Sequence, residues 1–218
     1  MLAYALPMLL FVLLLGVSSA LKGRGAALWL VAPEFWVYPL QTLLCATVLV
    51  YFRREYEFRP LRRPIFALLV ALLVFFLWIA PQQFLGFPPR VIGFNPDIFS
   101  GEPSLFWSTL VLRFIRLVIV VPFVEEIFWR GFLLRYLISE KFEAVPFGTF
   151  SWFSFAVVTV AFCCSHSLPD WPAALITGAL YNSVAYRTKS LGSCILAHSL
   201  TNLSLGLWIV AMKQWGFW

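Results

Sequence analysis

Two adjacent carboxylates lie in an apolar stretch of the sequence, "VEEIFWRGFLLR" at residues 124–135. Glu126 and Arg130 are spaced i, i+4, so on a helix they share a face and can neutralise each other. Glu125 points about 100° away around the same helix and has no such partner nearby in the sequence. An ionisable residue inside a membrane segment is a candidate functional residue, and a carboxylate of this kind can act as a general base or acid. The alternative is that all three charges pair with other buried polar groups and hold helices together.

The two histidines of the chain each have an i, i+4 partner. His166 follows Phe162 in "AFCCSHSLPD", and His198 precedes Asn202 in "ILAHSLTNLSLG". A carboxylate and an imidazole can activate water, while an imidazole and a carboxamide can donate hydrogen bonds to an oxyanion. Alone, each pair is also explained as a helix cap or an interhelical hydrogen bond. Together with Glu125 they provide the groups that hydrolyse an amide, and we expect them to meet in one half of the bilayer.

The elements that must position these residues are membrane spans. Of the 218 residues, 61% are hydrophobic and 12% are charged, against about 25% charged in a soluble domain. The sequence therefore predicts an integral membrane protein, with a single domain over residues 1–218. The net charge of +6 comes from basic residues between apolar runs, which indicates membrane topology rather than nucleic-acid binding.

Apolar runs predict an all-α polytopic bundle with about seven spans. These are expected near residues 2–20, 27–52, 65–86, 118–138, 148–167, 172–187 and 190–212. The run from 105 to 138 is 34 residues long, which is about 51 Å of helix against a hydrocarbon core of about 30 Å. Pro122 offers a kink, and Arg113 and Arg116 suggest an amphipathic helix. We therefore expect an interfacial helix over about 105–117.

The basic residues predict the orientation of the chain. Most of them fall on one side of this layout, which the positive-inside rule makes cytoplasmic. They are Arg53, Arg54, Arg59, Arg62, Arg63, Lys141, Arg187 and Lys189. Lys22, Arg24, Arg113 and Arg116 fall on the other side and oppose this assignment. Glu125 and His166 lie toward that second surface, so the cavity is expected to open toward the outer leaflet.

The three motifs E-E-x-x-x-R, F-x-x-x-H and H-x-x-x-N occur in this order in "EEIFWR", "FCCSH" and "HSLTN". In a multi-span protein they resemble the type II CAAX prenyl endopeptidases and their bacterial relatives, the CPBP or Abi family of intramembrane glutamate proteases. The resemblance covers roughly residues 120–205, within a catalytic core of about 105–212.

The resemblance implies a role for each matching residue. Glu125 would activate water with help from His166, which follows the motif residue Phe162. Glu126 would be the second carboxylate, held by Arg130. His198 and Asn202 would form the oxyanion hole.

The function implied is an intramembrane endopeptidase that hydrolyses a peptide bond of a membrane-associated protein or peptide, in a bacterial cytoplasmic membrane. No cofactor and no nucleic acid is expected, and the oligomeric state is left open. A zinc protease with Glu125, His166 and His198 as ligands is one alternative. The other is a non-catalytic membrane scaffold or immunity-type binding protein of the same fold.

Overall fold

The computed structural model describes the backbone of residues 1–218 and every side chain except that of Leu28. Helices make up most of the described chain, and no strand occurs in it. The α-helices are α1 (Leu2–Leu21), α2 (Leu28–Val31), α3 (Glu34–Tyr51), α4 (Pro64–Phe84), α5 (Pro103–Phe114), α6 (Val121–Glu126), α7 (Leu134–Tyr136), α8 (Trp152–Cys164), α9 (Trp171–Thr188) and α10 (Leu191–Met212). Two π-helical segments, Ile115–Val120 and Ile127–Leu133, join α5 to α6 and α6 to α7.

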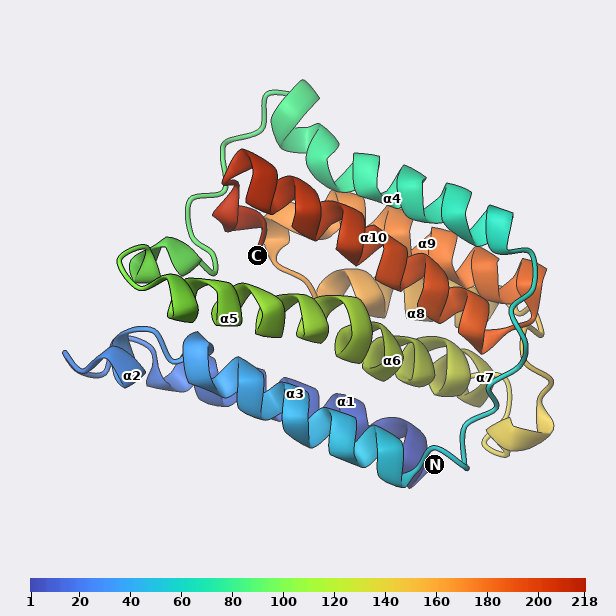
Figure 1. The fold of residues 1–218 in the computed structure, drawn as a ribbon. Coiled ribbons are helices and arrows are strands. Elements are labelled where there is room, and N and C mark those ends of the chain that lie inside the picture. Colours follow the sequence, from blue (N-terminus) through green and yellow to red (C-terminus); the bar gives the residue numbers. More distant parts are fainter.

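The predicted all-α membrane bundle is confirmed. Four helices among the described residues are long and apolar enough to cross a membrane: α1, α4, the continuous segment Pro103–Tyr136 and α10. The other predicted spans correspond to α3, α8 and α9, which are 18, 13 and 18 residues long. The seven helical segments together form one bundle (Figure 1).

The separate interfacial helix predicted at 105–117 is not observed. Its residues form the first part of one helix from Pro103 to Tyr136, which we call the central helix. Figure 1 shows it as a single ribbon through the labels α5, α6 and α7. We expected Pro122 to kink the helix and Arg113 and Arg116 to lie at the membrane interface. Instead, wide π turns precede the proline, and both arginines are buried, with exposed fractions of 6% and 5%.

The central helix lies between two groups of helices. On one side α1 packs against α3, and on the other α10 packs against α4 and α9, with α8 behind α9. The central helix contacts members of both groups. Small residues such as Ala71, Ala174 and Ala197 are fully or almost fully buried, which allows the helices to approach closely. Side chains on the central helix can therefore meet side chains from either group.

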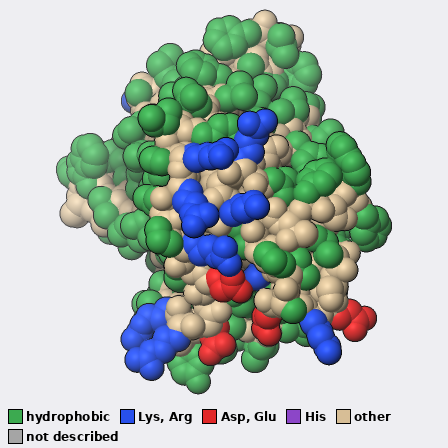
Figure 2. Space-filling model, turned by 90° about the vertical axis from the view of Figure 1, so that its right-hand side faces the viewer, with side chains coloured by type: hydrophobic (Ala, Val, Ile, Leu, Met, Phe, Trp, Pro, Cys, Tyr) green, Lys and Arg blue, Asp and Glu red, His purple; other side chains and the backbone are tan. Residues whose placement is uncertain are grey.

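One end of the bundle carries the predicted basic cluster. Figure 2 shows Lys and Arg side chains gathered over this end. The exposed basic residues of the cluster are Arg53, Arg54, Arg59, Arg62, Arg63, Lys141, Arg187 and Lys189. The segment that precedes α4 is fixed here to the start of α10, where Ser190 Oγ donates to the carbonyl oxygen of Pro60 at 2.9 Å.

The opposite end is closed by the segment after α4 and by the C-terminal tail. Arg90 pairs with Asp170 at 2.7 Å, and the Phe94 N–H donates to the Trp218 carbonyl at 3.1 Å. Gly93 is needed for this contact because a Cβ at that position would clash with the backbone of Trp215. These contacts hold aromatic residues of the tail over the ends of α4 and α10.

Candidate active site

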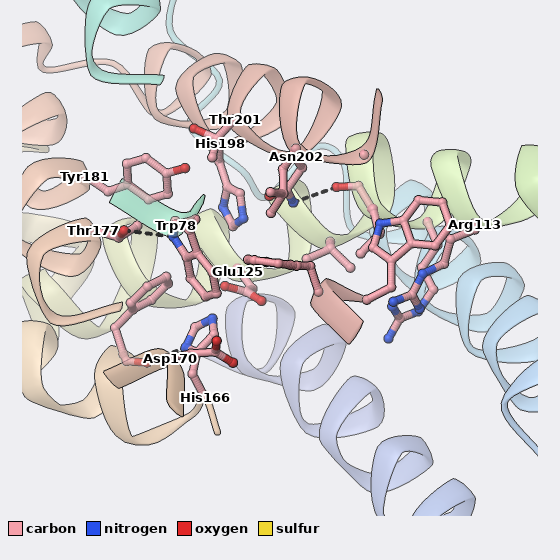
Figure 3. Close-up of a pocket in the computed structure, with 18 of the residues that line it drawn as sticks. Trp78, Arg113, Glu125, His166, Asp170, Thr177, Tyr181, His198, Thr201 and Asn202 are labelled. Atoms are coloured by element: carbon pink, nitrogen blue, oxygen red, sulfur yellow. Dashed lines mark hydrogen bonds between the residues drawn. The ribbon is translucent and has the colours of Figure 1, made fainter. Parts of the chain in front are cut away.

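A cavity of about 250 Å³ lies toward the end closed by the C-terminal tail, away from the basic cluster. The structure brings the predicted residues Glu125, His166, His198 and Asn202 together on its wall (Figure 3). Phe162 also lines it. Further lining residues come from α1, α4, the central helix, the turn Leu168–Asp170, α9, α10 and the tail: Phe11, Trp78, Arg113, Arg116, Asp170, Thr177, Tyr181, Thr201 and Trp218.

Glu125 provides the central carboxylate of the cavity. It is half-buried at the end of α6, between the two π segments. Its Oε2 atom is buried and has no hydrogen-bond partner among the described residues. Figure 3 shows this carboxylate between the rings of His198 and His166. A carboxylate oxygen without a protein partner can accept a hydrogen bond from a water or substrate in the cavity.

His166 is oriented by the helix that it follows. Its Nδ1 lies 2.8 Å from the Phe162 carbonyl oxygen, at the end of α8. Because a carbonyl oxygen only accepts, Nδ1 carries the proton, and Nε2 of the neutral ring is an acceptor. The ring also packs against Phe162 and Trp78, with centroid distances of 4.8 and 5.5 Å. The i, i+4 spacing therefore fixes the tautomer as well as the position.

Glu126 lies behind the cavity wall and joins two helices. Its Oε1 accepts from Arg130 Nη1 at 3.0 Å, and the expected Glu126–Arg130 pair is confirmed. The same oxygen lies 2.8 Å from His198 Nδ1 on α10. Arg130 also donates to Asn182 Oδ1 at 3.1 Å and to the Gly178 carbonyl at 3.4 Å, both on α9. Glu126 thus orients His198 instead of facing the cavity itself.

His198 and Asn202 present adjacent polar groups from α10. Since Nδ1 of His198 bonds Glu126, Nε2 is the nitrogen left for the cavity, and the ring packs on Tyr181 at 5.1 Å between centroids. Asn202 Nδ2 donates to the Leu117 carbonyl oxygen at 2.8 Å. A carboxamide nitrogen has two hydrogens, so this bond fixes the side chain and leaves one donor.

The Leu117 carbonyl is available because of a proline. Leu117 lies in the π segment Ile115–Val120, where a carbonyl bonds the N–H five residues later. That residue is Pro122, which has no N–H. The carbonyl is thus left without a backbone donor, and Asn202 takes it.

Sequence reasoning missed several residues that the structure places at the site. Arg113 and Arg116 line the cavity, although the sequence argument assigned them to the interface. Asn182 holds Arg130, and Trp78 contacts His166. These residues could have been noticed because they are polar or indole-bearing and occur within apolar runs. A buried polar group needs a hydrogen-bond partner, so such residues indicate contacts between helices.

The zinc alternative lacks a ligand set in this geometry. Among the described residues, no group of three or more His, Cys, Asp or Glu side chains is placed to hold a metal ion.

Comparison with known families supports the interpretation of the motifs. Residues 106–204 match the family model described as type II CAAX prenyl endopeptidase Rce1-like. No curated protein and no solved structure matches the chain. The matched stretch contains the candidate residues from Arg113 to Asn202, and the matched family is one of proteases. Over these residues the membrane protein is similar to the Rce1-like family, which is consistent with the CPBP membrane proteases that the three motifs predict.

Proposed function

We propose that the protein is an endopeptidase that hydrolyses a peptide bond of a membrane-associated protein or peptide with water activated by Glu125 and His166. The observation that supports this most is the unpartnered buried Oε2 of Glu125, in a cavity shared with both histidines. A general base needs such a free acceptor within reach of the water that it deprotonates.

In the proposed reaction, the water oxygen attacks the scissile carbonyl carbon and its proton passes to Glu125. Nε2 of His166 accepts a hydrogen bond from the same water and orients it. The tetrahedral intermediate collapses by breaking the C–N bond, and the proton held by Glu125 is transferred to the leaving amine. The products are one new carboxylate and one new amine, so no further reactant is needed.

The oxyanion of the intermediate would be stabilised from α10. On that wall of the cavity, the second N–H of Asn202 would be one donor. Nε2–H of His198 would be the other when the ring is an imidazolium, because Nδ1–H already donates to Glu126. The hydrogen bonds to Leu117 and Glu126 hold both side chains in place before substrate binds. Preorganised donors of this kind account for a large share of the rate in acyl transfer.

The test is Glu125→Gln, compared with Glu143→Gln at the exposed far end of the protein. New peptide termini in membranes that contain each variant would be quantified by mass spectrometry. We expect Glu125→Gln to lower cleavage about 10²- to 10⁴-fold with unchanged unfolding, and Glu143→Gln to behave as the native protein. Full biological activity of Glu125→Gln would favour the scaffold alternative.

The mechanism also predicts metal independence. Hydrolysis should persist after dialysis against a chelator, and the purified protein should contain less than stoichiometric zinc. Loss of activity that added zinc restores would support the metalloprotease alternative instead.

A further inference from the structure

Arg113 and Arg116 form a buried cationic pair on the cavity wall, and the proposed reaction does not use it. Both arise from the central helix, one turn apart, and both line the cavity that contains Glu125. Figure 3 shows Arg113 on the side of the cavity away from Trp78 and Thr177.

Neither arginine forms an ion pair with a carboxylate of the described chain. Among the described residues, no carboxylate oxygen lies within 4.0 Å of either guanidinium, whereas the buried Arg130 and Arg135 pair with Glu126 and Glu57, each at 3.0 Å. Burying a charge without a partner is costly. The contrast indicates that the missing counter-charge is supplied by a bound molecule.

Two donors of Arg113 are buried and have no partner. Its Nε and Nη1 atoms have no hydrogen-bond partner in the described structure. Its guanidinium lies over the rings of Tyr38, Phe94 and Trp218, at 5.2, 4.7 and 5.6 Å from their centroids. Aromatic faces attract a cation but accept no strong hydrogen bond, so Nε and Nη1 are left without an acceptor.

Arg116 is positioned by a chain of two hydrogen bonds that involves two other helices. Its Nε donates to Gln41 Oε1 at 2.8 Å, and Gln41 Nε2 donates to the Phe11 carbonyl at 2.6 Å. Only Nε of Arg116 takes part in this chain of hydrogen bonds. The two terminal nitrogens of the guanidinium are therefore left for a ligand in the cavity. A pair of guanidinium groups with free N–H donors is suited to a carboxylate.

We propose that Arg113 and Arg116 form a carboxylate-binding subsite for the peptide substrate, which deepens and rests on the proposed endopeptidase function. Both arginines line the same cavity as Glu125, so the carboxylate lies within a few residues of the cleaved bond. It comes from the C-terminus of the peptide or from an acidic side chain.

Binding to the Glu125→Gln protein tests the subsite without hydrolysis. The protein would be immobilised in phosphatidylcholine nanodiscs and offered pooled random apolar decapeptides with a free C-terminal carboxylate, a C-terminal amide, or a C-terminal amide plus one internal Glu. We expect one or both carboxylate forms to be enriched about ten- to hundredfold over the plain amide. The free-terminus and internal-Glu pools distinguish the two sources.

Arg113→Met and Arg116→Met should abolish this enrichment, and the exposed Arg63→Met should retain it. Removing an unpaired buried charge should leave unfolding unchanged or improve it. The proposal would be overturned if the three peptide pools bound equally or if no pool bound. It would also be overturned if the carboxylate pools were still enriched by both the Arg113→Met and the Arg116→Met variant. The binding would also be repeated in nanodiscs that contain phosphatidylglycerol. If this anionic lipid abolished the enrichment, the arginines would be assigned to a lipid phosphate instead. Absence of hydrolysis by the native protein would refute the protease but not the subsite.

Discussion

The pairing of Glu126 with Arg130 makes a strong prediction about stability. Both side chains are 0% exposed, and Arg130 also satisfies Asn182 and Gly178. Arg130→Met leaves the buried Glu126 carboxylate with only the His198 hydrogen bond. Breaking a buried pair by removing one partner costs about 3–5 kcal/mol, because the remaining charge is uncompensated.

A double substitution separates the lost charge from the lost packing. Arg130→Met with Glu126→Gln removes both charges and keeps the volume of each side chain, so it should recover most of the stability. The free energy of unfolding would be measured by SDS titration in mixed micelles and followed by circular dichroism. The double variant should be more stable than Arg130→Met by about 2 kcal/mol or more.

Arg113→Met is the matched control for Arg130→Met. It makes the same substitution on the same helix, at a buried arginine that has no carboxylate partner. We expect no loss of stability there. If Arg113→Met and Arg130→Met destabilised equally, or if the double variant were no more stable than Arg130→Met, the account of the buried charges would be refuted.

Three further predictions concern the site and its orientation. Asn202→Ala should lower kcat about 10²- to 10³-fold with little change in KM. A rise in KM as large as the fall in kcat would contradict an oxyanion role. Pro122→Ala restores an N–H that can compete for the Leu117 carbonyl, so hydrolysis should fall without loss of stability; an unchanged rate would show that this carbonyl does not position Asn202. In a background without the native cysteines, Asp170→Cys should react with an impermeant thiol reagent on intact cells and Arg187→Cys should not; the reverse pattern would invert the orientation.

The local part of the site could be predicted from the sequence because helical spacing determines it. Glu126 and Arg130 had to share a face, and His166 had to lie one turn after Phe162. The spans followed from apolar length, and their order placed Glu125 and His166 toward the same surface. These features depend on neighbours within one turn or on the thickness of the bilayer, which a single sequence contains.

Contacts between distant helices could not be predicted in this way. The Glu126–His198 bond joins residues 72 positions apart and depends on how α10 packs against the central helix. Arg113 and Arg116 were assigned to the interface because charged residues usually lie there. Their burial depends on Tyr38 from α3 and on Trp218 from the tail. The positions of these two residues cannot be read from the sequence pattern around the arginines.

The π segment around Leu117 shows how one residue can link the helix backbone to the chemistry of the site. We expected Pro122 to kink the helix and end an interfacial segment, but an interrupted helix and a wide turn have opposite consequences. A break would have separated Arg113 from Glu125 and placed them on different elements. The wide turn keeps them on one helix and frees the carbonyl that holds Asn202. Because Glu126 holds His198 from the same helix, both donors on α10 are fixed by the central helix, and a rotation of α10 against it would displace both together.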